Sequence, residues 1–311
     1  MEFRLTEDQR DLRAGVRELL AGRYGREALR ASLDTGTAVD RALWRELGEA
    51  GFFALRLPEE DGGVGLGLPE AVLVFEEAGR ALVPGPLVAT HLAAGTVPGA
   101  AEGRAVVTAY DLAGGLVAYL AESDAVLGAG VPDGGLPDGG WSRVGLPDGT
   151  ATASVDPLTP LHRVAGAGVA GAYREQGALL TAALQLGSAL RTVELAVAYA
   201  GEREQFGQPI GAFQAVKHLC AQMLVRAELA RTAVYAAAVT GVPAETAAAK
   251  LLADEAAVRN ARDCLQVHGG MGFTWEADVH LHLKRAWVRA EQWCTAAEAE
   301  EALAADLLHA A

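Results

Sequence analysis

The sequence predicts a mostly α-helical protein in which a small β region separates two helical parts. Apolar residues recur with helical spacing in residues 1–96 and again in residues 171–311. Residues 97–170 instead carry short, β-prone apolar runs separated by glycine, together with three Pro-Asp-Gly triplets. These ranges are the predicted domains: an N-terminal helical domain, a reduced middle β domain and a C-terminal four-helix bundle. Because 51% of the 311 residues are hydrophobic and only 6% are aromatic, we expect a large, mostly aliphatic core.

Four helices are expected in the N-terminal domain, each with its apolar residues on one face. They cover residues 7–21, 41–51, 69–81 and 87–94. Thr6 is suited to cap the start of the first helix. On the third helix Glu76 and Glu77 are expected to be solvated. The glycine- and proline-rich residues 55–67 are predicted to form a loop before that helix.

Five short strands are expected in the β domain. They fall at residues 105–110, 115–120, 125–129, 141–144 and 150–155. The Pro-Asp-Gly triplets at 132–134, 137–139 and 147–149 predict turns between or before strands. Their spacing is too irregular for a repeat architecture.

The C-terminal domain is expected to contain five helices. They cover residues 177–200, 213–240, 244–268, 276–288 and 296–309. Pro243 is well placed to begin the third of them, because proline is tolerated in a first helical turn. Long helices joined by short loops predict neighbours that run antiparallel, as in a four-helix bundle.

Composition excludes several classes of function. The formal net charge of −14 argues against binding to nucleic acid or to an anionic membrane surface, both of which need a basic surface. Three cysteines, Cys220, Cys264 and Cys294, have the spacing of neither a disulfide framework nor a metal site, which favours a reducing compartment and predicts no metal. No apolar signal-peptide core is present, and no run reaches the ~18 apolar residues of a membrane span. We therefore expect a soluble cytoplasmic protein.

A short polar turn within the helical bundle is the first candidate ligand site. It contains Arg203 and Phe206, between two long predicted helices. Arginine offers a planar fork of donors, which suits a diphosphate. The alternative is a surface arginine paired with Glu202 or Glu204, beside a phenylalanine packed under the turn.

A glycine-rich loop at the end of a later helix is the second candidate. Residues 266–272 read Gln-Val-His-Gly-Gly-Met-Gly. Glycine allows a backbone to approach a ligand closely. A plain helix C-cap would need only Gly269, and His268 is more easily explained as part of such a cap than as a ligand contact. The loop follows a helix, so it is no Rossmann fingerprint. Together the two loops predict a dinucleotide site.

Three segments carry a resemblance to a known family: LPEEDGGVGLG at 57–67, REQFGQPIGAFQ at 203–214 and QVHGGMGFTWE at 266–276. The sequence resembles the acyl-CoA dehydrogenases over nearly its whole length. The resemblance implies FAD as cofactor and an acyl-CoA as substrate. It also implies a reaction in which a carboxylate removes the α-proton and the β-hydrogen leaves as hydride. The residues that it assigns to the FAD of a neighbouring subunit are Arg203, Gln205, Phe206, Gln266, Gly269 and Gly270.

The match fails where the family carries its catalytic glutamate. The commoner family position lies in a Tyr-Glu-Gly-Thr-like segment, but residues 288–295 read Val-Arg-Ala-Glu-Gln-Trp-Cys-Thr, with Glu291 as the nearest carboxylate. The other family position falls on Gly177. Glu175 is the candidate base there, although two residues on a helix are a rotation of about 200°. Glu175 can therefore serve only if the helix start is irregular, and the alternative is a solvated carboxylate.

The β domain also lacks the Thr-Glu-Pro…Gly-Ser-Asp-like and Trp-Ile-Thr-Asn-like segments that hold the isoalloxazine ring in the family. Some actinobacterial-type members form α2β2 heterotetramers with fewer flavins than subunits, and they act on thioesters of bulky acids such as steroid side chains. The missing features resemble the degenerate partner of such a pair. Three hypotheses follow: a subunit sharing a flavin with a second chain, a self-sufficient homomeric dehydrogenase with Glu175 as base, or a flavin-free scaffold. The first two need an electron-transfer acceptor.

Overall fold

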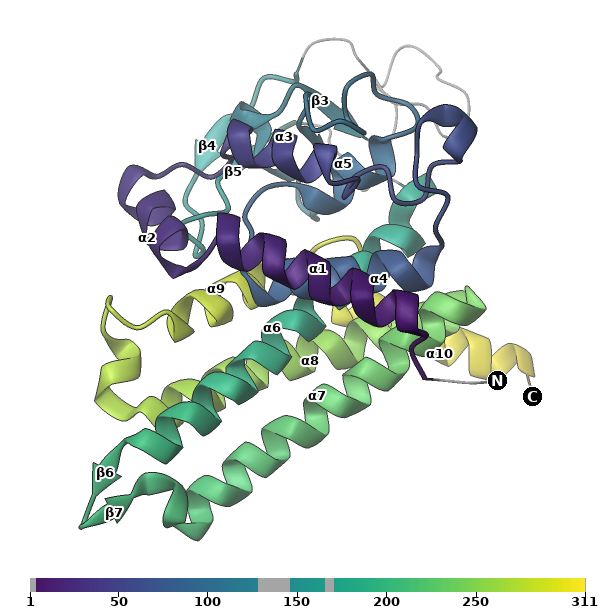
Figure 1. Cartoon of the computed structure of the whole chain (residues 1–311). Coiled ribbons are helices and arrows are strands. Elements are labelled where there is room, and N and C mark those ends of the chain that lie inside the picture. Colours follow the sequence, from purple (N-terminus) through teal and green to yellow (C-terminus); the bar gives the residue numbers. More distant parts are fainter. Residues whose placement is uncertain (1–3, 128–145, 166–170, 311) are drawn as a thin grey trace.

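The computed structural model describes residues 4–127, 146–165 and 171–310, and most of these residues are helical (Figure 1). The N-terminal part contains α1 (Glu7–Arg23), α2 (Arg26–Thr35), α3 (Arg41–Glu49), α4 (Leu68–Arg80) and α5 (Leu87–Ala93). Thr6 caps α1 through a reciprocal pair of bonds with Gln9, which confirms the predicted start. Helix α2 was not predicted, because its buried face is only Leu29 and Ser32. Gly36 ends α2 in the left-handed conformation.

Two small sheets make up the described β region. Strand β1 (Val107–Ala109) pairs in parallel with β3 (Ala125–Leu127). Strands β2 (Leu116–Ala118), β5 (Leu161–Arg163) and β4 (Thr150–Thr152) form an antiparallel sheet in the order β2-β5-β4. Four predicted strands contain observed ones, whereas β5 was not predicted. The expected strand at 141–144 and the first two Pro-Asp-Gly triplets lie outside the described residues.

The C-terminal part contains α6 (Arg174–Glu202), α7 (Gln214–Thr240), α8 (Pro243–His268), α9 (Val279–Ala290) and α10 (Ala296–Ala310). The long helices α6, α7 and α8 lie side by side, and α9 and α10 pack on α8 (Figure 1). Helix α9 begins three residues later than predicted. The preceding residues form a turn instead, and Arg30 donates to the carbonyls of Trp275 and Glu276 there.

Helix α4 joins the N-terminal helices to the bundle, and its backbone touches that of α6 at two glycines. A Cβ on Gly79 would lie 2.0 Å from the Leu184 carbonyl oxygen, and one on Gly187 would lie 1.8 Å from the Glu76 carbonyl oxygen. No larger residue fits either contact without separating the helices. The main apolar core is accordingly continuous from the N-terminal helices through the β region to the bundle. The boundaries 1–96, 97–170 and 171–311 stay a prediction.

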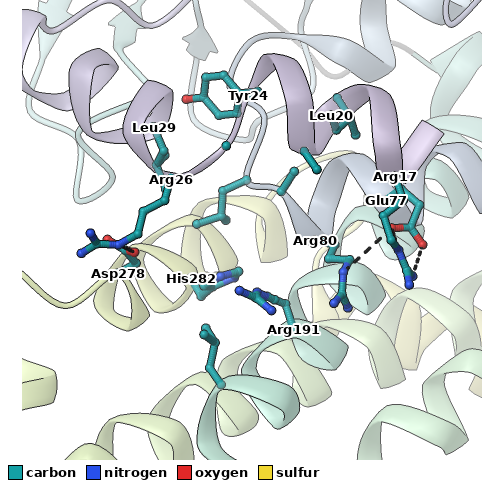
Figure 2. A pocket seen from close by; sticks show the side chains of 15 residues that line it. Arg17, Leu20, Tyr24, Arg26, Leu29, Glu77, Arg80, Arg191, Asp278 and His282 are labelled. Carbon is teal, nitrogen blue, oxygen red and sulfur yellow. Dashed lines mark hydrogen bonds and ion pairs between the residues drawn. The ribbon is translucent and has the colours of Figure 1, made fainter. Parts of the chain in front are cut away.

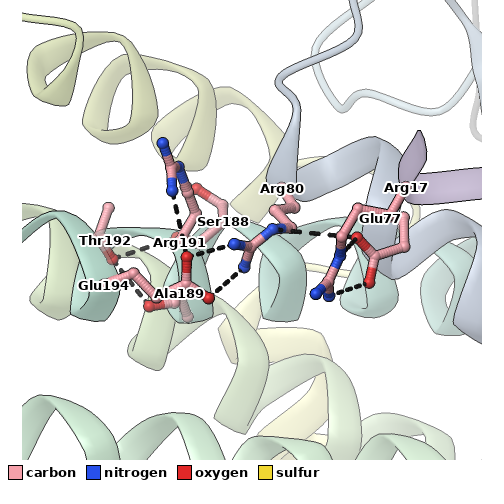
Figure 3. A network of polar contacts seen from close by, with 8 residues as sticks. All are labelled: Arg17, Glu77, Arg80, Ser188, Ala189, Arg191, Thr192 and Glu194. Atoms are coloured by element: carbon pink, nitrogen blue, oxygen red, sulfur yellow. Dashed lines mark hydrogen bonds and ion pairs between the residues drawn. The ribbon is translucent and has the colours of Figure 1, made fainter. Parts of the chain in front are cut away.

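The expectation that Glu76 and Glu77 are solvated is wrong. Helix α4 is covered by α1, α6 and α7, so both side chains are buried. Glu77 accepts two bonds from Arg17, at 2.8 and 2.6 Å, and lies 3.9 Å from Arg80 Nε (Figure 3). Glu76 accepts from the Tyr235 hydroxyl at 2.6 Å, and burial raises the pKa of Glu76. The carboxylates are accommodated because each has a hydrogen-bonding partner.

Candidate functional site

A two-residue hairpin connects α6 to α7 at one end of the bundle (Figure 1). Strand β6 (Glu204–Gln205) pairs with β7 (Gln208–Pro209), and the turn consists of Phe206 and Gly207. Both turn residues have positive φ, 55° and 77°, which matches the twist that such a hairpin needs. Phenylalanine rarely adopts this conformation, and its side chain here is 93% exposed. The chain therefore holds a large apolar ring in solvent on a strained backbone.

Arg203 directly precedes the hairpin as the C-cap of α6. Its N–H donates to the Tyr199 carbonyl and its carbonyl accepts from Ile210 N–H, both at 2.8 Å, so the main chain is fixed. The side chain is exposed and forms no salt bridge with any described carboxylate. The alternative of a pair with Glu202 or Glu204 is therefore wrong. An anchored guanidinium without a counterion is available to an anionic ligand.

The hairpin also carries the third residue that the family resemblance assigns to the cofactor. Gln205 is exposed, and its Nε2 donates to the Glu204 carbonyl at 2.7 Å. This bond leaves the side-chain oxygen of Gln205 free to accept.

The glycine loop follows α8, and its glycines differ in what they do. Gly269 has a φ of 58° and its N–H donates to the Gln266 carbonyl, so it is the helix C-cap. Gly272 is packed, because a Cβ there would lie 3.0 Å from the Leu265 carbonyl oxygen. Gly270 is not required for either purpose, because its φ is not in the left-handed region and a Cβ would meet open space. Gly270 and the exposed Gln266 are thus the positions of this loop that the chain's own packing does not explain.

A ring stack brings the hairpin and the glycine loop to the same end of the bundle. Tyr199, one turn before Arg203, stacks on His268 with ring centroids 4.1 Å apart and planes at 20°. His268 Nδ1 donates to the Cys264 carbonyl at 2.8 Å. His268 is therefore occupied within the chain, as the sequence favoured.

Exposed apolar side chains lie beside both loops. Met271 and Phe273 are 55% and 76% exposed beside the glycine loop. An open hollow of about 560 Å³ lies beside the hairpin, with walls that include Val197 and Val216 and with Lys217 as its charged residue. Exposed apolar surface of this extent is typical of a contact with a ligand or another chain.

A second region, the Trp293 seam, lies where the β region meets α6 and the connection between α9 and α10. Trp293 is 2% exposed and has a φ of 63°. Its indole ring covers Gly177, so that a Cβ on Gly177 would lie 2.2 Å from Trp293 Cδ2. The two places where the family resemblance puts a base thus meet at one contact, and an indole ring fills it. The sequence shows a glycine in an apolar helix and a tryptophan far along the chain. Neither residue indicates that it contacts the other.

Asp111 completes the Trp293 seam from the β region. The Trp293 N–H donates to the Asp111 carbonyl at 2.6 Å, and Gln292 Nε2 donates to Asp111 Oδ2 at 2.7 Å. Asp111 Oδ1 is buried without a hydrogen-bond partner in the described chain. Burial raises the pKa of Asp111 to about 7. The cavity here measures about 30 Å³, which is too small for a three-ring isoalloxazine. This seam therefore does not fit a flavin ring, whereas the loops at the bundle end fit a diphosphate.

The structure does not bring either candidate carboxylate to the Trp293 seam. Helix α6 starts regularly at Arg174, and Glu175 is exposed in its first turn while Gly177 is buried. Glu291 is the exposed C-cap of α9. Within the described residues, no three His, Cys, Asp or Glu side chains gather so that they could hold a metal ion.

Comparisons with known proteins identify the class of protein that this fold belongs to. Residues 6–104 match the N-terminal domain of the acyl-CoA dehydrogenases, and residues 165–292 match their C-terminal domain. The chain belongs to the acyl-CoA dehydrogenase family, which is a family of oxidoreductases. None of the described helices is both long and apolar enough to cross a membrane.

Among individual proteins, the chain is similar to acyl-CoA dehydrogenase IpdE2 of Mycobacterium tuberculosis. The two are 37% identical over 90% of this chain and 91% of that protein. Acyl-CoA dehydrogenase FadE34 of the same organism is 35% identical over 89% of this chain but only 45% of its own length. The solved ChsE4-ChsE5 complex from Mycobacterium tuberculosis contains a chain with 26% identity, 99% coverage of both chains and a TM-score of 0.83. Butyryl-CoA dehydrogenase from Megasphaera elsdenii, 21% identical with a TM-score of 0.84 over 99% of this chain and all of that one, shares the fold.

Proposed function

We propose that this chain is one subunit of a heteromeric, FAD-dependent acyl-CoA dehydrogenase and that it completes a flavin site held mainly by a second family chain. The observation that carries the proposal is the contrast between its two regions. The two candidate cofactor loops are exposed, with the Arg203 side chain unpaired, while Trp293 covers Gly177, one of the positions where the family resemblance puts the base. One chain of this kind has half of a site and needs another chain for the rest.

The outward half of the site is suited to the dinucleotide part of FAD. Arg203, fixed at the end of α6, would donate to the diphosphate, and hydrogen bonds to a charged group contribute about 1.5–3 kcal/mol. Phe206 would lose its exposed surface against the cofactor or the partner. Gly270 would let the backbone of the glycine loop approach, with Gln266 and Gln205 as polar contacts and Gly269 shaping the loop. When bound, FAD accepts the β-hydrogen of the substrate as hydride.

This chain does not supply the proton-abstracting carboxylate in this proposal. A base must reach the α-carbon in a pocket that excludes water. Glu175 is exposed on the first turn of α6, and Gly177 is covered by Trp293. A self-sufficient homomer with Glu175 as base would require that turn to rearrange, so the structure favours the shared site.

Solved relatives supply the precedent for two different chains. Two structures of high similarity carry names of pairs, the ChsE4-ChsE5 complex and the Tcur3481-Tcur3483 steroid acyl-CoA dehydrogenase. The latter is 25% identical to this chain, with a TM-score of 0.83 over 98% of both chains. We therefore propose a heterotetramer that oxidises the acyl-CoA thioester of a bulky, ring-bearing acid such as a steroid side chain, in the cytoplasm, and passes electrons to a separate acceptor.

Co-expression with a neighbouring family member is the decisive test. The chain alone should be soluble and colourless, and the co-purified pair should be yellow, with fewer flavins than subunits and with acyl-CoA-dependent reduction of an electron acceptor. A yellow and active lone chain contradicts the proposal. If no family partner yields flavin, the remaining hypothesis is the flavin-free scaffold.

A further inference from the structure

A separate pocket lies between α1, the start of α2, α4, α6 and α9, away from both regions described above (Figure 2). Its volume is about 210 Å³. One part of its wall is apolar and is formed by Leu20, Leu29, Leu82 and Leu195. The other part carries the guanidinium groups of Arg17, Arg26, Arg80 and Arg191. The pocket thus offers cations and an apolar wall to the same occupant.

The pocket is locally cationic in a strongly acidic chain. Its lining contains four arginines but only two carboxylates, Glu77 and Asp278. The next neighbours leave this balance unchanged, because Glu194 accepts from Arg80 and Arg30 binds Asp278. Two positive charges therefore remain in excess, although the whole chain has a net charge of −14. Such a local excess selects for an anionic ligand.

Arg191 is the arginine of this pocket that forms the fewest hydrogen bonds within the protein. Its side chain donates one bond, at 3.1 Å, to Glu194, which already receives two bonds from Arg80 (Figure 3). Its other N–H groups have no acceptor among the described residues. Across the pocket Arg191 lies near the ring of His282 (Figure 2), whose Nδ1 is bonded to Ser188 Oγ at 2.8 Å. Because the Arg191 side chain is 40% exposed, these donors are open to solvent and to an anionic occupant of the pocket.

His282 is buried beside Arg191 and carries no charge of its own. The ring is 3% exposed, and burial followed by the charge of Arg191 lowers the pKa of His282 to about 3. His282 is therefore neutral, and Arg191 is the charged group on this side of the pocket. The structure around them is otherwise well paired, since Arg17 and Arg80 each bind a carboxylate through two nitrogens.

We propose that this pocket binds a small organic carboxylate, with Arg191 as the principal donor to the carboxylate and the leucine wall against a short apolar tail. Arginine matches a carboxylate in a planar, two-bond geometry. The volume of about 210 Å³ is far more than a single water needs and leaves room for the tail. The inference uses only residues of this chain and is independent of the flavin proposal.

Butyrate and its neutral isostere butyramide test the proposal by calorimetric titration of the full chain, in complex with its partner where one is required. Butyrate should bind and butyramide should not. Arg191→Gln should weaken butyrate binding at least about tenfold, because a bond to a charged group is lost. Arg259→Gln is the matched control: it removes the same charge and also breaks a surface pair, with Glu255, outside the pocket.

A second variant guards against an effect on folding. Ala21 lines the pocket on the exposed side of α1, so Ala21→Leu adds bulk without changing charge and should abolish binding while the thermal unfolding midpoint stays unchanged. Equal binding of butyrate and butyramide, no butyrate binding at all, or wild-type affinity in Arg191→Gln would each overturn the proposal.

Discussion

The end of the bundle that carries the hairpin and the glycine loop contrasts with the Trp293 seam. At the bundle end, a charged side chain without a counterion and an apolar ring are both exposed, on a main chain that is firmly hydrogen-bonded. At the Trp293 seam, a large ring is buried against a glycine and the neighbouring groups bond to each other. The first region leaves a charged group and an apolar ring open to solvent, whereas the second packs against the chain itself and leaves only Asp111 Oδ1 without a partner among the described residues. The difference is what the proposed shared site requires: one region open to a partner and one closed by the chain's own side chains.

Truncation of Trp293 should produce the largest change. Removing a fully buried ring leaves a cavity, and such substitutions cost about 3–5 kcal/mol. Trp293→Ala should therefore lower the free energy of unfolding by about that amount in urea titrations. Trp287→Ala is the control, since Trp287 is 37% exposed and should cost much less. A similar, small cost for both would mean that Trp293 is a movable lid and not part of the packed core.

The buried carboxyl group of Asp111 should make the free energy of unfolding depend on pH. Its pKa is about 7 in the fold against an ordinary 3.8. Between these two pH values the folded state binds one proton more than the unfolded state. The contribution of Asp111 to the free energy of unfolding is therefore full below pH ~4 and is lost as the pH rises through 7. The loss is roughly 1 kcal/mol per pH unit. Asp111→Asn removes the titration and keeps an acceptor for Gln292. Unfolding at a series of pH values should show a flatter profile for the variant, and identical slopes would contradict the burial argument.

The sequence predicted the regular parts of the molecule well and the Trp293 seam not at all. The long helices follow from apolar periodicity and caps, as at Thr6 and Pro243, and these are local signals. Gly177 and Trp293 are far apart in the chain, so their contact depends on how α6 packs against the end of α9. Glu77 was misjudged for the same reason, because its partner Arg17 lies on another helix.

For the two candidate loops, the family motif supplied the residues but not the contacts that their side chains make. The sequence left open whether Arg203 was paired with a neighbouring glutamate. The structure decides this, because the hairpin places Glu204 in a strand and leaves the guanidinium unpaired. No local pattern could show this, since Glu202, Arg203 and Glu204 are adjacent and any pairing depends on the path of the turn.

A smaller effect is expected from Arg203, and it should appear in binding alone. Arg203→Gln should weaken flavin retention in the co-expressed pair by about 1.5–3 kcal/mol, roughly 10- to 150-fold. The free energy of unfolding of the Arg203→Gln chain should not change, because the side chain is exposed and unpaired. Flavin content after dialysis and the urea midpoint measure the two effects. Arg104→Gln, an exposed arginine near the β region, is the control and should alter neither.

Glu175→Gln is expected to leave the rate of acyl-CoA oxidation unchanged. Loss of a general base lowers a rate by about 10²–10⁴-fold. Because Glu175 is exposed and does not reach the Trp293 seam, the variant pair should turn over acyl-CoA at the wild-type rate. A loss of activity of that size, with flavin still bound, would restore the homomeric hypothesis.

Phe206→Gly should change the stability of the lone chain only slightly, and it separates the role of the ring in the complex from its role in the fold. Glycine relieves the cost of a positive φ at this turn, about 1–2 kcal/mol, but it also gives the unfolded chain more freedom, which offsets roughly 0.5–1 kcal/mol. The ring is 93% exposed and contributes almost no burial to the isolated chain. The free energy of unfolding should therefore rise slightly or stay level, while the flavin content or assembly of the co-expressed pair falls. A variant that is as stable as the parent but assembles less well would show that Phe206 acts in the complex. Loss of stability in the lone chain would show instead that the ring packs within this chain.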